Sequence, residues 1–261
     1  MRSERDVAVE VDQLSKRYFL RGGRAQELKA MFLNLPGLFT NGRRAGHEFW
    51  ALRDISFTLR RGECLGVAGP NGSGKSTLLR VLAGITKPTS GRLELHGRIS
   101  ALLELGAGFH PQITGRENAL LNAVLLGLSM REARDVLPEI IEFSELGEFI
   151  DQPMRTYSSG MYVRLGFAVA VYVKPEILLV DEVLAVGDAE FQSKCFGHMD
   201  TLRKAGVTVV FASHDLPSLQ RYTDRVMLLE HGRPVLEGKP DEVLHQYLVR
   251  VFGPTAKAAN R

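Results

Sequence analysis

The chain is poor in cysteine and contains no long apolar run. Its 261 residues include two cysteines, Cys64 and Cys195, which lie far apart with no metal-ligand spacing around either. This scarcity argues against a disulfide framework and favours a reducing compartment with unreactive thiols. Apolar runs such as Gly166–Val173 end after eight residues, whereas a membrane-spanning helix needs about 20. We therefore expect no transmembrane segment in this chain.

The sequence also lacks a secretory signal and a broad basic surface. Its first residues carry charges where a secretory signal would be apolar, so we expect no export of the protein itself. Residues 1–61 hold 12 Lys and Arg against 7 Asp and Glu, whereas residues 62–261 hold 21 against 23. Because a nucleic-acid binder more often spreads its basic excess over a face or a tail, this local excess argues against a nucleic-acid partner.

Apolar patterning predicts an α/β fold with two sheets. Cys64–Ala68, Ile177–Val180 and Val207–Ala212 are continuously apolar, as expected for strands of a parallel sheet that is covered on both faces. Val7–Val11 and Ile55–Leu59 alternate apolar with polar residues, which is typical of antiparallel strands with one wetter face. The core should therefore be a mostly parallel sheet with an N-terminal antiparallel β subdomain.

A helical subdomain is expected within this α/β frame, at about residues 115–173. Glu117–Leu126, Arg131–Phe143 and Gly160–Val173 carry helical patterns, and no convincing strand separates them. We expect residues 1–251 to form one domain, followed by a short tail at 252–261.

Residues 19–49 form a long insertion between two predicted strands. Long connections are uncommon unless they are functional or disordered. Ala25–Leu35 has the spacing of a short amphipathic helix. The insertion carries a net charge of +3, which would suit a membrane surface or a transporter subunit.

Residues 69–76 read GPNGSGKS and match the phosphate-loop pattern G-x-x-x-x-G-K-[ST]. The apolar strand Cys64–Ala68 leads into the motif and a helical run, Thr77–Ala83, follows it. Backbone N–H groups of the turn and of the helix N-terminus should therefore converge on an anion. Lys75 would reach the β- and γ-phosphates, and the Ser76 hydroxyl would hold Mg²⁺. The residues expected to bind nucleotide here are Gly69, Pro70, Asn71, Gly72, Ser73, Gly74, Lys75, Ser76 and Thr77.

Polar residues follow two of the predicted parallel strands. Asp181 and Glu182 come directly after Ile177–Val180, at the strand end where α/β sheets bind ligands. Asp181 is suited to orient Mg²⁺ and Glu182 to polarise an attacking water as general base; the alternative is an acidic cap on a turn. His214 follows the next strand and would contact the γ-phosphate, unless it is only a cap or a surface residue.

Tyr157–Met161 reads YSSGM and precedes a predicted helix. The hydroxyls of Ser158 and Ser159, together with Gly160, would make a second anion site at a helix N-terminus. A plain N-cap explains the same residues equally well.

The order of these motifs resembles the ATP-binding cassette (ABC) ATPases over about residues 7–250. In that family YSSGM stands where the LSGGQ signature usually occurs. The resemblance implies a head-to-tail homodimer in which this element binds the γ-phosphate held by the partner's phosphate loop. It also implies that Asp188 is the D-loop aspartate and that Tyr18 stacks on adenine, with Trp50 as the alternative. The Q-loop glutamine is missing, and Glu104 is its plausible substitute.

Three segments narrow the resemblance to ATPases of bacterial polysaccharide exporters, which move O-antigens, teichoic acids or capsules: LLELGAGFHPQITGREN, YSSGMYVRLGFAVA and DEVLAVGDAEFQSKC. The resemblance implies a peripheral, Mg²⁺-dependent ATP hydrolase at the cytoplasmic face of the inner membrane. A separate polytopic permease would handle the lipid-linked polysaccharide. The alternatives are a soluble cassette ATPase acting on nucleic acid or ribosomes and a small-molecule P-loop kinase.

Overall fold

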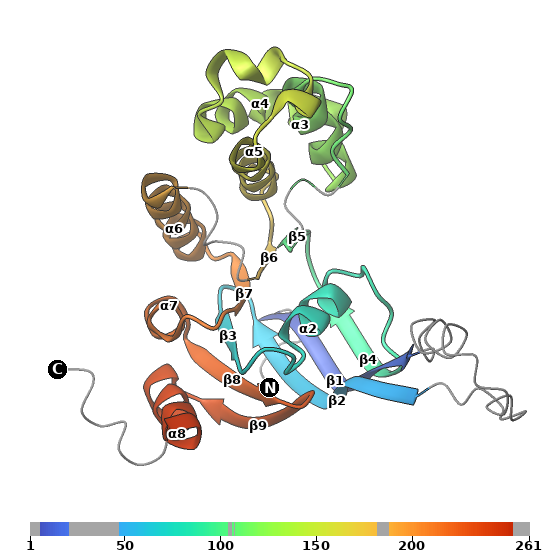
Figure 1. The fold of residues 1–261 in the computed structure, drawn as a ribbon, viewed down its shortest axis with the longest axis vertical. Helices are drawn as coiled ribbons and strands as arrows, with labels where there is room; N and C mark the ends of the chain where they lie inside the picture. The colour runs from blue at the N-terminus through green and yellow to red at the C-terminus, as the bar shows by residue number, and fades with distance from the viewer. Residues whose placement is uncertain (1–5, 21–46, 104–105, 107, 182–187, 253–261) are drawn as a thin grey trace, which may run out of the picture.

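The computed structural model describes residues 6–20, 47–103, 106, 108–181 and 188–252. Two β-sheets occupy one half of the molecule, and a group of helices lies at the other end, beyond strands β5 and β6 (Figure 1). Among the described residues, no helix combines the length and apolar character that crossing a membrane requires.

The smaller sheet is antiparallel and has the strand order β2-β1-β4. Its strands are β1 (Val7–Leu20), β2 (His47–Arg60) and β4 (Ser90–Leu95). β1 and β2 are longer than the sequence pattern predicts because a register shift between Val11 and Leu14 interrupts the apolar alternation. Gln13 has a positive φ at this irregularity, and beyond it the ladder continues until Leu20 pairs with His47.

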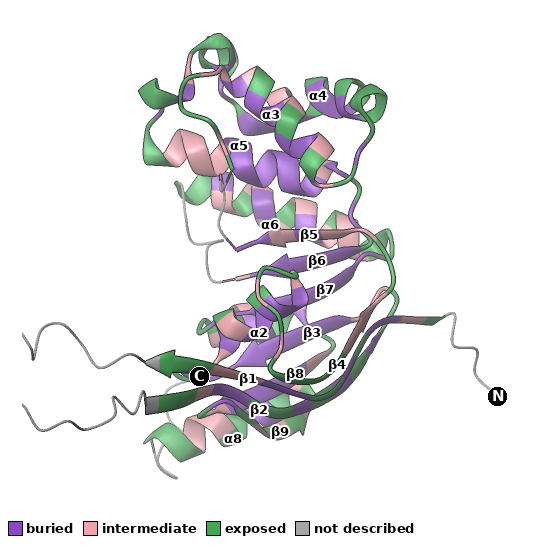
Figure 2. Ribbon diagram, turned by 90° about the vertical axis from the view of Figure 1, so that its right-hand side faces the viewer, coloured by how far each residue is buried: buried purple, intermediate pink, exposed green. Residues whose placement is uncertain are grey.

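The larger sheet has six strands in the order β5-β6-β7-β3-β8-β9. They are β3 (Cys64–Ala68), β5 (Ile99–Leu102), β6 (Ile177–Val180), β7 (Thr208–Ala212), β8 (Arg225–Glu230) and β9 (Arg233–Gly238). Every pairing is parallel except the antiparallel pairing of β8 with β9. The central strands β6, β7 and β3 are buried throughout (Figure 2), which confirms the predicted α/β class with a covered parallel sheet.

The two faces of the larger sheet belong to two hydrophobic clusters. Ile177 and Leu179 of β6 pack with α2 (Lys75–Leu82) and with the antiparallel sheet. Leu178 and Val180 point to the other cluster, with the helices of the far layer. This alternation follows from the period of two along a strand. The far layer includes α6 (Ala189–Lys204), α7 (Leu216–Tyr222) and α8 (Pro240–Phe252).

The helical region comprises α3 (Gly115–Leu125), α4 (Met130–Ser144), α5 (Ser159–Tyr172) and two short 3₁₀ helices, η2 (Gly147–Asp151) and η3 (Met154–Thr156). α3 and α4 each begin with a reciprocal capping box, Thr114 with Glu117 and Ser129 with Glu132. The chain enters this region after β5 and leaves it into β6, and these two strands are neighbours in the sheet. The region is therefore an excursion from one sheet edge.

Candidate nucleotide site

The phosphate loop connects β3 to α2. Two of its positions need glycine because backbone atoms of neighbouring strands lie too close for a side chain. Gly69 has a φ of 145°, and a Cβ there would lie 2.2 Å from the Leu229 carbonyl oxygen. Gly74 has a φ of 112°, and a Cβ there would lie 2.7 Å from the Ala51 carbonyl oxygen. Both backbone conformations favour glycine. The loop is therefore pressed between β8 and β2, which fixes where its N–H groups lie.

Lys75 lies within this loop as a buried cation. Its side-chain Nζ donates to the carbonyl oxygens of Gly69 at 2.8 Å and Pro70 at 3.2 Å. Burial lowers the pKa of Lys75, and the nearby negative charge of Asp181 partly opposes that shift. An anionic ligand in the loop would favour the charged ammonium in the same way.

The loop also holds a polar atom that suits a phosphate oxygen. The Ser73 hydroxyl is buried and has no hydrogen-bond partner among the described residues. Buried polar groups are normally paired, so an orphaned hydroxyl in a ligand loop indicates a missing partner. Pro70, Asn71, Gly72 and Ser76 are exposed, whereas Gly74 and Thr77 are half-buried.

The donor set fits Mg²⁺. Ser76 lies in the first turn of α2, and Asp181 directly follows β6, close enough for its charge to oppose the burial that lowers the Lys75 pKa. A hydroxyl and a carboxylate are hard oxygen ligands of the type that Mg²⁺ takes alongside phosphate oxygens. These two residues, predicted as metal ligands, could hold the ion together with a bound nucleotide.

His214 lies beside the phosphate loop. It follows β7, the direct neighbour of β3, and is exposed. With Gly69, Pro70 and Asn71 it lines a hollow of about 440 Å³, whose other wall includes residues of α8. Asp215, and not His214, is the N-cap of α7: its carboxylate accepts a hydrogen bond from the Ser218 N–H. The expected γ-phosphate contact of His214 stays a prediction.

Two other predicted residues, Glu182 and Glu104, lie outside the described part of the chain. The general-base role of Glu182 and the Q-loop role of Glu104 therefore stay predictions.

The Ser158–Gly160 element belongs to the helical region and not to this chain's own phosphate loop (Figure 1). Ser158 is the N-cap of α5, and its hydroxyl accepts from the Met161 N–H at 3.3 Å. Ser158 and Ser159 are exposed, and Gly160 is half-buried. The local N-cap reading is thus satisfied, while the exposed hydroxyls leave this helix end accessible to a second molecule.

Tyr18 is the more accessible of the two candidate adenine-stacking residues. It lies on β1 with 37% of its surface exposed, and Lys16 Nζ is 4.9 Å from its ring centroid. The Trp50 ring is half-buried, with the guanidinium groups of Arg17 and Arg53 over it at 5.3 and 5.4 Å. A cation therefore lies over each of the two rings, and the adenine contact of Tyr18, with Trp50 as the alternative, stays a prediction.

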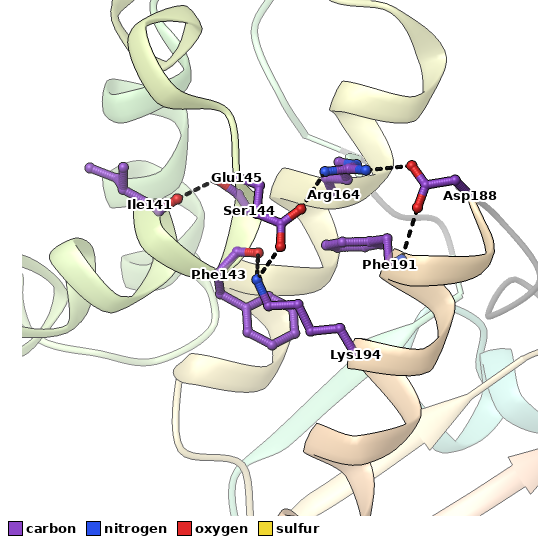
Figure 3. Close-up of polar contacts among 8 residues, drawn as sticks. All are labelled: Ile141, Phe143, Ser144, Glu145, Arg164, Asp188, Phe191 and Lys194. Carbon is purple, nitrogen blue, oxygen red and sulfur yellow. Dashed lines mark hydrogen bonds and ion pairs between the residues drawn. The ribbon is translucent and has the colours of Figure 1, made fainter.

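Asp188 has partners that motif reasoning missed. Its carboxylate accepts from the Phe191 N–H at the start of α6 and pairs with Arg164 of α5 (Figure 3). Both contacts lower the pKa of Asp188 below its usual range, the backbone contact most. The one sequence signal for Arg164 is its place shortly after YSSGM. The predicted nucleotide contact of Asp188 stays a prediction.

Comparisons with known proteins agree with this geometry. Residues 52–185 match the family model for ABC transporters. The chain is 50% identical over 202 residues to an O-antigen export system ATP-binding protein of Klebsiella pneumoniae, covering 77% of this chain and 82% of that protein. A teichoic acids export ATP-binding protein of Lactococcus lactis is 40% identical over 241 residues, which is 92% of this chain but 50% of the longer relative.

Solved structures support the same fold. A dimeric ATP-binding cassette in a post-hydrolysis state, bound to ADP and phosphate, superimposes with a TM-score of 0.70 at 23% identity, covering 89% of this chain and 98% of that one. An ATP-binding subunit of an ABC transporter gives a TM-score of 0.71 at 23% identity, covering 93% and 94%. From the family model and the identity to exporter ATPases, the chain belongs to the ABC transporter family, among the ATP-binding proteins of polysaccharide exporters.

Proposed function

We propose that this chain hydrolyses ATP as the peripheral subunit of an exporter, working as a head-to-tail dimer on a separate membrane permease that carries a lipid-linked polysaccharide. The observation that carries the proposal is the convergence of Lys75, Asp181 and His214 on one phosphate loop, in a chain 50% identical over 202 residues to an O-antigen export ATPase subunit.

Each predicted site residue has a distinct task in ATP hydrolysis. Lys75 and the loop N–H groups hold the β- and γ-phosphates, and His214 contacts the γ-phosphate from the neighbouring strand end. Ser76 and Asp181 would hold Mg²⁺, which would neutralise charge on the phosphate oxygens. Glu182 takes the proton of the attacking water.

The exposed N-terminus of α5 supports a site shared between two copies. Ser158 and Gly160 lie in the helical region, whereas the phosphate loop joins β3 to α2 in the half of the molecule that holds the sheets (Figure 1). A protomer that uses both elements on one nucleotide therefore needs a second copy, and a structural neighbour is a dimeric cassette.

The apolar surface of the helical region suits the permease. Leu121 and Leu125 of α3 are 42% and 68% exposed, and Met130, which begins α4, is 48% exposed. A hollow of about 260 Å³ lies nearby, lined mostly by apolar residues between α3, α5, β5 and the segment after α2. Exposed apolar groups of this kind mark protein contacts.

Co-purification from detergent-solubilised membranes tests the permease. The tagged protein should recover a polytopic membrane protein, and Leu125→Glu should reduce the recovery because it places a charge on the apolar face. Val235→Glu is the matched control, since Val235 lies on β9 and is 38% exposed. Recovery of nucleic acid without a polytopic protein would contradict the exporter proposal.

A further inference from the structure

The turn between α2 and β4 holds the strand that carries Tyr18. The last three residues of this turn, 87–89, form hydrogen bonds with residues 15–17 of β1. Tyr18 is the next residue along that strand. The roles assigned above to the phosphate-loop residues do not explain these contacts.

Thr89 continues the pairing of β1 at the point where β4 begins. The ladder between β1 and β4 reaches as far as the pair Ser15 and Ser90. The Thr89 N–H donates to the Ser15 carbonyl oxygen at 2.8 Å, and the Thr89 Oγ1 accepts from the Arg17 N–H at 2.9 Å. The hydroxyl therefore satisfies a backbone donor of β1 that lies beyond the last residue pair of the ladder.

The hydrogen bond to Thr89 lies at an irregularity of β1. The register of β1 against β2 shifts between Lys16 and Arg17. Such an irregularity disrupts the ladder locally and changes the direction of the side chains beside it. The bond from the Arg17 N–H to Thr89 therefore fixes the backbone at the point that sets the direction of the next side chain, Tyr18.

The same turn holds the cation beside the Tyr18 ring. Lys16 Nζ donates to the Lys87 carbonyl oxygen at 2.8 Å and lies 4.9 Å from the centroid of the Tyr18 ring. A cation occupies one face of an aromatic ring, and a base stacks on the opposite face. Both the backbone before Tyr18 and the cation over its ring are thus held by residues 87–89.

The turn is also fixed to the helix that begins in the phosphate loop. The N–H groups of Ile85 and Thr86 both donate to the Arg80 carbonyl oxygen, at 3.0 and 3.2 Å, which closes the end of α2. Pro88 fixes its own φ at about −65° and restricts the residue before it. A nucleotide that binds through its phosphates and its base needs these two positions held relative to each other, and the turn connects them.

We propose that Thr89 is a positioning residue for the nucleotide base. Its hydroxyl holds β1 so that Tyr18 presents its ring to adenine, while the phosphates occupy the loop at the other end of α2. Thr89 acts through the Arg17 N–H and not by touching the nucleotide. This inference rests on the adenine contact predicted for Tyr18 and adds the residue that orients it.

Loss of the Thr89 hydroxyl should affect the base and spare the phosphates. Removal of one such hydrogen bond should weaken ATP binding between about threefold and tenfold. Inorganic tripolyphosphate has the phosphate chain of ATP without a base, so its affinity should not change. The γ-phosphate is also unaffected, so the KM for ATP should rise while kcat at saturating ATP stays the same.

Calorimetric titration of the whole chain with ATP and with tripolyphosphate tests the inference. Thr89→Val keeps the branched shape without the hydroxyl, so it should lower the affinity for ATP alone. Thr89→Ser keeps the hydroxyl and should restore that affinity. Ser56→Ala is the matched control, because the Ser56 hydroxyl accepts from the Gln13 N–H at 2.8 Å, at the earlier irregularity of β1. It should shift the Tm similarly and leave both affinities unchanged.

Tyr18→Ala separates this inference from the base contact itself. Loss of stacking should weaken ATP binding about tenfold or more, and Thr89→Val should then have no further effect in the double variant. Wild-type ATP affinity in Tyr18→Ala would contradict the adenine contact, and the role of Thr89 with it. Weakened binding in Tyr18→Ala but not in Thr89→Val would overturn the role of Thr89 alone. Equal losses of ATP and tripolyphosphate affinity in Thr89→Val would also overturn it, because they would indicate a general distortion.

Discussion

Lys75 is a cation that the fold buries before any nucleotide is bound. The energetic cost of that burial is visible in its lowered pKa, and carbonyl oxygens of its own loop accept its hydrogen bonds. Phosphate oxygens are stronger acceptors for an ammonium than neutral carbonyls are. When a phosphate binds, the Lys75 ammonium therefore exchanges its weaker carbonyl acceptors for stronger phosphate oxygens. Its position is already fixed by β3 and α2.

Glu182→Gln should abolish turnover and leave ATP binding in place. The amide cannot take a proton from water, and loss of a general base typically lowers a rate about 10²- to 10⁴-fold. Phosphate release under saturating ATP measures the first effect, and binding of a fluorescent nucleotide measures the second. Hydrolysis near the wild-type rate would remove Glu182 from the role of base.

Short motifs made the phosphate loop predictable, whereas the ion pair between Arg164 and Asp188 could not be predicted from the sequence. The residues that shape the loop are neighbours in sequence, so their spacing carries the chemistry. Arg164 and Asp188 are 24 positions apart, and they meet only because α5 packs beside α6. No local pattern encodes that packing, and an arginine four residues after Gly160 reads equally as a surface residue.

At the scale of the element, helix interiors were predictable and helix starts were less so. The apolar pattern places helices at Glu117, Arg131 and Gly160, whereas the structure begins them at Gly115, Met130 and Ser159. The difference arises because capping residues stand before the apolar pattern begins. For β1 the end of the element was harder to predict than its start. The irregularity at Gln13 breaks the apolar alternation, so the pattern does not reveal that the strand continues.

Gly115→Ala should destabilise the helical region. A Cβ at Gly115 would lie 2.0 Å from the Tyr157 hydroxyl oxygen and 3.1 Å from the Ile150 carbonyl oxygen. Tyr157 is held there because its hydroxyl donates to the Phe149 carbonyl oxygen at 2.7 Å. Overpacking of this kind costs about 1–3 kcal/mol, measurable by urea unfolding.

Gly197→Ala is the matched control within α6. A Cβ at Gly197 would meet nothing within 4 Å, so the higher helix propensity of alanine should raise the free energy of unfolding by about 0.5–1 kcal/mol. Equal stability changes in the two variants would contradict the close contact at Gly115. Adding Tyr157→Phe to Gly115→Ala should recover part of the loss, since it removes the nearest atom.

At the scale of the whole molecule, the charge surplus is concentrated in a segment with closely paired ends. Residues 19–49 carry a net charge of +3, and Leu20 pairs with His47 where β1 and β2 end. The proposed amphipathic helix Ala25–Leu35 lies outside the described residues. Its role in docking therefore stays a prediction.

Reversing the charge at Arg21, Arg24 and Lys29 should weaken docking to the membrane and leave ATP hydrolysis intact. Anionic headgroups attract basic residues by about 1 kcal/mol each. Sedimentation with vesicles containing anionic lipid measures the loss. A triple reversal at Arg60, Arg92 and Arg233, which lie on the two sheets, gives the comparison. Undiminished sedimentation of the first variant would show that the insertion does not carry the docking.

The strand order of the larger sheet also decides when the nucleotide site can form during protein synthesis. β3 leads into the phosphate loop, yet the strands that hydrogen-bond to it, β7 and β8, come much later in the chain. A central strand needs both neighbours to satisfy its backbone groups. A nascent chain that ends before Arg225 therefore contains the complete loop sequence but lacks β8, one of the two strands that pair with β3. We therefore expect ATP binding to require synthesis of the chain through β8, and shorter translation products should not compete for nucleotide.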